Sequence, residues 1–156
     1  MLELKLEDES KTLLLGSTIG KTIEDLVTKD FEIHLNGDLG SGKTTLVRGI
    51  LKYFNWKDVV TSPSYTLCEE YEIKDKLLLH VDLYRINCGE DVEVLNLDRD
   101  TVLQKIIFIE WPRNLRTDRT ADVIINLDHD NQARRASIKC KDIDIESSIK
   151  TYNENN

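Results

Sequence analysis

A glycine-rich octapeptide holds the residues of this chain that are most suited to chemistry. Residues 37–44 read Gly-Asp-Leu-Gly-Ser-Gly-Lys-Thr, which fits the pattern G-x-x-x-x-G-K-[ST] at every fixed position. In such a loop the glycines let successive backbone N–H groups point inward at a polyphosphate, and the following helix adds its positive N-terminal end. We expect Lys43 to neutralise the β and γ phosphates and the hydroxyl of Thr44 to ligate Mg²⁺. The predicted nucleotide-binding residues are Gly37, Asp38, Leu39, Gly40, Ser41, Gly42, Lys43 and Thr44.

Two acidic residues that follow apolar, strand-like runs are candidates for the metal and the attacking water. Glu110 comes directly after residues 106–109, and Asp82 directly after residues 77–81. Parallel sheets bind ligands at the carboxyl edge of their strands, so we expect both acids near the phosphate loop. The spacing leaves open which of them touches the metal. His80 lies on the same side of an extended strand as Asp82, where it either is structural or helps to place a water.

Two further segments lie next to these acids. Trp111 follows Glu110 directly, and Pro112 then ends the strand because proline lacks a backbone N–H. From its chemistry the indole is either part of the core or a lid near the nucleotide. Residues 61–64 read Thr-Ser-Pro-Ser, a composition that indicates a loop ahead of the Asp82 strand.

The elements around the glycine loop have the order that a phosphate loop requires. Residues 31–35 form a strand-like run that leads into the loop, and residues 43–54 follow it with helical periodicity. Ser10 is expected to cap an earlier helix. Other strand-like runs lie at residues 2–6, 65–73, 77–83, 106–109, 123–127 and 136–140. We predict a single-domain P-loop NTPase fold of the α/β class, with a central, mostly parallel sheet flanked by helices. The domain is expected to cover residues 1–149, and residues 150–156 to form a disordered tail.

Composition limits the size and setting of the protein. With 156 residues and 40% hydrophobic content, the chain suffices for one domain with a core and is too short for two. A net charge of −8 disfavours broad contact with nucleic acid, which needs dense Lys and Arg. Cys68, Cys88 and Cys140 are widely separated and contain no C-x-x-C pair, so we expect free thiols in a reducing compartment. Charged residues interrupt residues 1–28, which predicts no signal peptide or membrane span and a cytoplasmic protein.

Four motifs follow one another in an order and spacing that resemble the TsaE family. The glycine loop continues into Thr45, and residues 62–67 then read Ser-Pro-Ser-Tyr-Thr-Leu. Residues 80–85 read His-Val-Asp-Leu-Tyr-Arg, and residues 110–112 read Glu-Trp-Pro. The second motif is the most specific to the family, in which it forms a switch-like loop.

The resemblance covers roughly Ser10 to Ala136 and includes some departures from the family pattern. Ser64 stands where the family usually has Thr, which keeps the hydroxyl and removes a methyl group. Ala133-Arg134 replaces a usual Gly-Arg. The positions expected to bind phosphate and metal match the family.

The resemblance implies a P-loop ATPase that acts with the TsaD and TsaB proteins. That assembly transfers threonylcarbamoyl to an adenosine beside the anticodon of tRNA, and ATP hydrolysis by TsaE is implied to reset the TsaB–TsaD pair between turnovers. The tRNA is expected to be reached only indirectly, through the complex. By analogy, Lys43 serves the phosphates, Thr44 the Mg²⁺, Glu110 the metal and hydrolysis, and Asp82 the same catalytic cluster. Thr45 and Trp111 join the nucleotide site, and the switch loop comprises Ser62, Pro63, Ser64, Tyr65 and Thr66.

Other functions use the same phosphate loop and stay open as alternatives. A small-molecule kinase would close an arginine-rich lid over the phosphates, and Arg113, Arg116 and Arg119 offer one. The second and fourth motifs have no role in that scheme. A noncatalytic, ATP-dependent adaptor is the other alternative. A GTPase is disfavoured because the chain has no Asn-Lys-x-Asp segment for reading guanine.

Overall fold

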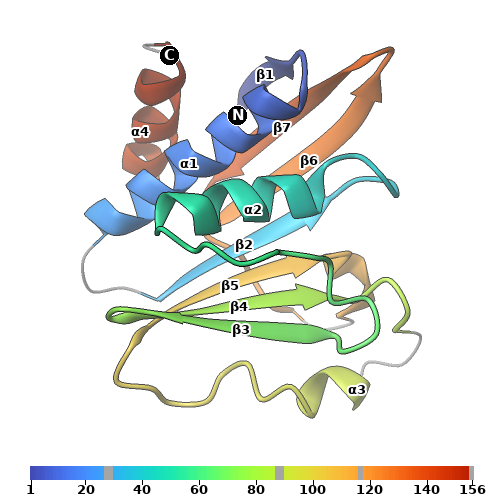
Figure 1. Ribbon diagram of the computed structural model, residues 1–156, viewed down its shortest axis with the longest axis vertical. Helices are drawn as coiled ribbons and strands as arrows, with labels where there is room; N and C mark the ends of the chain where they lie inside the picture. The colour runs from blue at the N-terminus through green and yellow to red at the C-terminus, as the bar shows by residue number, and fades with distance from the viewer. Residues whose placement is uncertain (27–29, 87–89, 116–117, 155–156) are drawn as a thin grey trace.

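Figure 1 shows the computed structural model of the chain, which describes residues 1–26, 30–86, 90–115 and 118–154. Within these ranges the strands are β1 (Leu2–Leu6), β2 (Phe31–Asn36), β3 (Cys68–Ile73), β4 (Lys76–Asp82), β5 (Gln104–Glu110), β6 (Val123–Asp130) and β7 (Ala133–Cys140). The helices are α1 (Glu9–Asp25), α2 (Lys43–Tyr53), α3 (Glu90–Glu93) and α4 (Ile143–Glu154), with a 3₁₀ turn, η1, at Pro112–Asn114. None of these described helices has the length and apolar character needed to cross a lipid bilayer.

The described strands form one mixed sheet in the order β1-β7-β6-β2-β5-β4-β3. Its four central strands, β6, β2, β5 and β4, are parallel. The strands outside this centre pair antiparallel. Tight connections join β3 to β4 and β6 to β7, and β1 pairs with β7 at the far edge. The predicted single-domain α/β fold with a central sheet is therefore confirmed, and its parallel part is the centre of the sheet.

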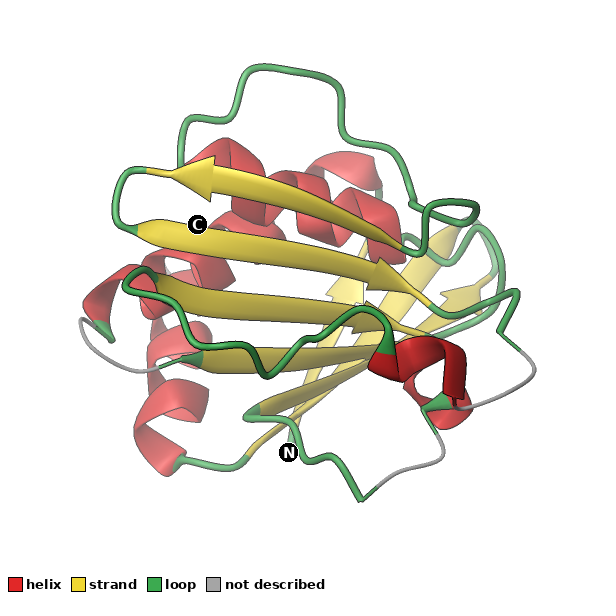
Figure 2. Ribbon diagram, turned by 90° about the horizontal axis from the view of Figure 1, so that it is seen from below, coloured by secondary structure: helices red, strands yellow, loops and turns green. Residues whose placement is uncertain are grey.

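The two faces of the sheet are covered in different ways. Helices α1, α2 and α4 lie on one face, while α3 and residues 94–103 lie on the other (Figures 1 and 2). Side chains alternate between the faces along each strand. Leu78 and Phe108 belong to the core under the long helices, whereas Leu79 and Ile107 belong to the core on the opposite face. The strands at the centre of the sheet are therefore buried on both sides, as their near-continuous apolar sequences require.

Two structural details differ from the sequence-based expectations. The side chain of Asp8, rather than that of Ser10, caps α1 by accepting a hydrogen bond from the Lys11 N–H at 2.9 Å. Helix α4 continues to Glu154, so the predicted disordered tail is wrong for residues 150–154, and residues 155–156 lie outside the described residues. Burial of Ile145 and Ile149, one helical turn apart, stabilises α4 against the sheet and α1.

The cysteines that the structure describes are free thiols. Cys68 and Cys140 form no disulfide, and Cys88 lies outside the described residues. Burial raises the pKa of the Cys68 thiol to about 11 and that of the Cys140 thiol to about 11. Both thiols are therefore protonated near neutral pH and are poor nucleophiles.

Helices α1 and α2 approach each other closely where glycines face across the contact. A Cβ atom added to Gly16 would lie 2.4 Å from the Leu46 carbonyl oxygen and 2.8 Å from the Gly49 Cα. A Cβ atom added to Gly49 would lie 2.4 Å from the Leu13 carbonyl oxygen. Because these neighbours are backbone atoms, they cannot turn aside. This contact fixes the position of α2, the helix that follows the glycine loop.

The substitution Gly16→Ala is expected to destabilise the protein by about 1–3 kcal/mol, because the new methyl group must push the two helices apart. Urea denaturation measures this change in the free energy of unfolding. Lys11→Ala, at an exposed position of the same helix, is the matched control and should stay within about 0.5 kcal/mol of the original chain. Equal stability of the two variants would contradict the close-contact account.

Candidate functional site

A cavity of about 220 Å³ opens at the carboxyl edge of the parallel strands, beside the start of α2. The ends of β4 and β5 meet there because Asp82 lies opposite Glu110 in the parallel register, while Leu35 of β2 lies opposite Glu110 on the other side. Figure 1 shows the β2–α2 connection at this edge. The residues that line the cavity are Leu39, Gly40, Gly42, Lys43, Thr44, Thr45, Ser62, Ser64, Asp82, Glu110, Trp111 and Arg134.

The glycine loop takes backbone conformations that favour glycine at each of its three glycines. Gly37 has a φ of 142°, Gly40 of 76° and Gly42 of 105°. Gly37 is also closely surrounded, since a Cβ atom there would lie 2.4 Å from the Leu127 carbonyl oxygen. Gly40, in contrast, faces open space. The pattern of glycines in the sequence therefore reflects both the curl of the loop and its contact with β6.

Lys43 folds back into the loop that precedes it. Its ammonium group donates to the carbonyl oxygens of Gly37 at 2.7 Å and Asp38 at 2.9 Å. Burial lowers the pKa of Lys43, although the nearby carboxylates of Glu110, Asp82 and Asp38 act in the opposite direction. The ammonium also lies 4.4 Å from the centroid of the Trp111 ring. A buried cation thus forms part of the cavity wall.

Glu110 joins the end of β5 to the start of α2. Its Oε1 atom accepts a hydrogen bond from the Thr44 hydroxyl at 3.0 Å, and the same atom lies 2.8 Å from His80 Nε2. Glu110 is 3% exposed and His80 is 0% exposed. The carboxylate that the sequence placed near the phosphate loop is therefore in direct contact with a residue of that loop.

Asp82 is held by the segment between α2 and β3. Its Oδ2 atom accepts hydrogen bonds from the hydroxyls of Ser62 and Ser64, the latter at 2.9 Å. Its Oδ1 atom accepts from the Tyr84 N–H at 2.9 Å. Both serines of the predicted switch loop thus contact the second predicted acid, and a hydroxyl at position 64 is sufficient for that contact.

Trp111 forms the aromatic part of the cavity wall. Its ring centroid lies 5.0 Å from that of Tyr84 and 4.8 Å from the guanidinium carbon of Arg113. Its backbone is left-handed, with a φ of 60°, which costs a non-glycine residue about 1–3 kcal/mol. This strained turn directs the indole toward Lys43, and it leaves Trp111 only 8% exposed. The indole is therefore a buried side chain that also lines the cavity. The structure thus gives it features of both alternatives, a core residue and a residue beside the expected nucleotide site.

Six of the residues that the sequence predicted for the site do not line the cavity. Gly37, Asp38 and Ser41 shape the glycine loop, whereas Pro63, Tyr65 and Thr66 do not line the cavity. Tyr65 is 83% exposed.

The arginines proposed for a kinase lid do not gather over the cavity in the described part of the chain. Arg113 stacks on Trp111, but Arg119 pairs with Glu32 and Asp98, and Arg116 lies outside the described residues. Phe31 and Ile33 pack in the core beneath the long helices. Because side chains alternate along a strand, Glu32 lies on the opposite face of the sheet, away from α2. The described arginines therefore give the lid hypothesis no support.

Arg134 lines the cavity, although sequence reasoning did not single it out as a site residue. It comes from β7, and a Cβ atom added to Gly42 would lie 3.2 Å from Arg134 Nε. The signal in the sequence was the Ala133-Arg134 pair, which keeps the arginine of the family's usual Gly-Arg. The antiparallel pairing of β6 with β7 brings this second cation to the loop, and such pairing is not visible in the sequence alone.

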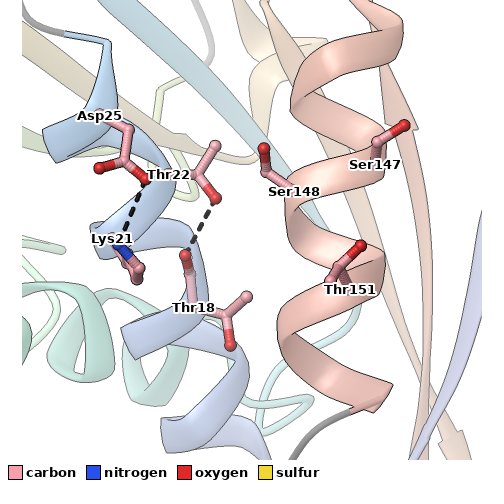
Figure 3. Close-up of a pocket in the computed structure, with 7 residues that line it drawn as sticks. All are labelled: Thr18, Lys21, Thr22, Asp25, Ser147, Ser148 and Thr151. Atoms are coloured by element: carbon pink, nitrogen blue, oxygen red, sulfur yellow. Dashed lines mark hydrogen bonds and ion pairs between the residues drawn. The ribbon is translucent and has the colours of Figure 1, made fainter.

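The cavity combines cations with carboxylates, whereas a larger hollow elsewhere has no comparable chemistry. Within the described ranges, no three His, Cys, Asp or Glu side chains gather closely enough to hold a metal by themselves. The larger hollow, about 390 Å³, lies between α1 and α4 (Figure 3). There Thr22 donates its hydroxyl to the Thr18 carbonyl at 3.1 Å, and Lys21 pairs with Asp25 at 3.3 Å. Both contacts lie within α1, so these polar groups stabilise their own helix.

Comparison with known proteins gives consistent matches. The sequence profile of the family described as "Threonylcarbamoyl adenosine biosynthesis protein TsaE" matches residues 6–137. The "tRNA threonylcarbamoyladenosine biosynthesis protein TsaE" of Haemophilus influenzae is 37% identical over 133 residues, which cover 84% of each chain. The protein of the same name from Aquifex aeolicus is 31% identical over 128 residues, covering 81% of this chain and 86% of its own. The crystal structure of Bacillus subtilis YdiB has a similar fold, with a TM-score of 0.73 at 20% identity over 99% of this chain and 95% of its own.

Alanine substitutions at two loop glycines are expected to separate close contact from backbone strain. Gly40→Ala should cost about 1–2 kcal/mol, because it only forces an L-residue into a left-handed conformation. Gly37→Ala should cost about 1–3 kcal/mol more, because its methyl group also meets the Leu127 carbonyl. Chemical denaturation of both variants measures the difference. If Gly40→Ala proved the more damaging of the two, the described loop geometry would be wrong.

Proposed function

Since the chain belongs to the TsaE family of threonylcarbamoyladenosine biosynthesis proteins, we propose that it is a Mg²⁺-dependent ATPase that supports this tRNA modification. One observation carries the proposal: Lys43 and Thr44 of the glycine loop share a single cavity with Glu110 and Asp82. A phosphate-binding loop, a metal-binding hydroxyl and a strand-end carboxylate are the parts that P-loop hydrolases use.

The donor set of the cavity suits a magnesium-bound triphosphate. Glycine-loop N–H groups and the N-terminus of α2 favour anions, and Lys43 and Arg134 add positive charge. Thr44 and Glu110 are already in contact, and they supply the hydroxyl and carboxylate oxygens that Mg²⁺ prefers. When bound, the metal would neutralise charge on the phosphate oxygens. The absence of a larger acidic cluster among the described residues agrees with a cation that is held partly by phosphate and water.

Each residue of the chain then has a distinct task in hydrolysis. Lys43 exchanges its two carbonyl contacts for phosphate oxygens, and its buried position strengthens that attraction. Glu110 and Asp82 orient water at the edge of the cavity, because a carboxylate accepts hydrogen bonds from a water that must attack. Trp111 covers Lys43 and limits access of bulk water. Thr45 completes the phosphate end of the site.

The contact between the switch loop and Asp82 supports a coupling of ATP to partner binding. Ser62 and Ser64 hold Asp82 from one side, so a change at Asp82 on binding or hydrolysis reaches the exposed Tyr65 in the same loop. We propose that this loop docks on a partner while ATP is bound and releases it after hydrolysis. The proposed partners are TsaD and TsaB, with tRNA reached through them, in the cytoplasm. This arrangement would allow repeated rounds of modification.

Reconstitution with TsaB, TsaD, tRNA, ATP and Mg²⁺ tests the proposal, with each component omitted in turn. Modification is expected to continue for many rounds only when this chain is present, and to stop after about one round without it. Lys43→Ala should behave like omission of the chain, because phosphate binding is lost. Lys52→Ala, an exposed lysine of the same helix, is the control and should support full turnover. Undiminished turnover with Lys43→Ala would refute the proposed role of ATP.

A further inference from the structure

His80 lies within the parallel part of the sheet, at a buried position where an imidazole needs a hydrogen-bonding partner. It is fully buried on β4, opposite Phe108 of β5, and faces the same side as the core residue Leu78. A buried polar group without a partner is costly. Its Nε2 atom meets the Glu110 Oε1 atom at 2.8 Å. The imidazole is therefore buried next to Glu110, on the side of that carboxylate away from the cavity.

The surroundings of the imidazole determine which ring nitrogen carries hydrogen. Its Nδ1 atom is buried and has no hydrogen-bond partner among the residues that the structure describes. A hydrogen on Nδ1 would leave a buried N–H group unpaired, whereas a hydrogen on Nε2 is donated to a carboxylate oxygen. The structure therefore favours the tautomer with hydrogen on Nε2, and His80 is the donor in its contact with Glu110.

The contact leaves the two oxygens of Glu110 in different situations. Oε1 accepts from both His80 and Thr44, at 2.8 and 3.0 Å. No described residue donates a hydrogen bond to Oε2, and Glu110 lines the cavity. Two donors from different elements, β4 and α2, oppose rotation of the carboxylate about its terminal torsion, which is otherwise soft. Oε2 is thereby left for the cavity.

We infer that His80 is a positioning residue that orients Glu110 for ATP hydrolysis, an inference that rests on the proposed function. His80 does not line the cavity, so it acts through Glu110 and not on the nucleotide. Partners in this outer position typically change activity 10- to 100-fold when they are removed. Nucleotide affinity depends mainly on the glycine loop and Lys43, and it should change little.

A second histidine–glutamate pair provides a matched control. His34 Nε2 lies 2.8 Å from Glu32 Oε1, the same separation as in the His80–Glu110 pair. His34 is 7% exposed, but its pair lies on the opposite face of the sheet and does not line the cavity. Glu32 is also held by Arg119. Loss of the His34 contact should therefore leave hydrolysis unchanged.

The variants His80→Phe, His80→Gln and His34→Phe test the inference in the 156-residue chain, with ATP and Mg²⁺, alone and with TsaB and TsaD added. His80→Phe keeps a ring of similar size and removes the donor, so kcat should fall about 10- to 100-fold while KM for ATP stays within about threefold. His80→Gln can place an amide N–H near the former Nε2 and should recover most of the loss. His34→Phe should retain kcat. Equal kcat in His80→Phe and the original chain would overturn the inference, as would a failure of Gln to recover more activity than Phe.

A spectroscopic readout does not depend on activity or on the folding of any variant. The ¹⁵N chemical shifts of the two His80 ring nitrogens in the original chain are expected to show hydrogen on Nε2, the nitrogen that faces Glu110. An Nε2 atom that carries no hydrogen would overturn the inference. If the original chain hydrolyses no ATP, the proposed function fails. If it hydrolyses ATP while His80→Phe is equally active, only the role of His80 fails.

Discussion

The parallel register of β2, β5 and β4 is the constraint on which the site depends. It places the last residues of three neighbouring strands at one edge, so that Asp82 and Glu110 lie side by side next to the start of the glycine loop. The close contact of Gly16 with α2 then fixes the helix that carries Lys43 and Thr44. The hydrogen bond from Thr44 to Glu110 joins these two parts of the fold. Sheet register and helix packing thus set the geometry of the cavity before any ligand is present.

Buried polar side chains interrupt two otherwise apolar strands beside the cavity. Strands β4 and β5 are buried along most of their length, and packing alone would favour apolar residues throughout. His80, Asp82 and Glu110 interrupt that pattern on the face toward α2. Their burial is offset by hydrogen bonds to one another and to hydroxyls of Thr44, Ser62 and Ser64. Hydrogen bonds that join several elements in this way make the network rigid, which suits the proposed role of the site in holding carboxylates in one orientation.

Local signals made much of this structure predictable from sequence. The glycine pattern at residues 37–44 demands special backbone angles, and the strand and helix beside it are strongly periodic. The expectation that Asp82 and Glu110 lie near the glycine loop agrees with the cavity that they share, whereas phosphate binding by this loop stays a prediction. Arg134 reaches the cavity only through the pairing of β7 with β6, a nonlocal contact that no short motif encodes. Helix α4 was missed because, among its side chains that the structure describes, Ile145 and Ile149 are the only buried apolar residues in a largely polar segment. Which hydrogen-bond partner each acid has likewise follows from tertiary packing.

The central claim is that the glycine loop ahead of Lys43 binds a triphosphate. Isothermal titration calorimetry of the folded chain with ATP, in the presence and absence of Mg²⁺, tests it most directly. The account predicts saturable binding at one site, strengthened by Mg²⁺ and abolished by Lys43→Ala. Absence of ATP binding by well-folded protein in the presence of Mg²⁺, or unchanged affinity in the Lys43 variant, would contradict it.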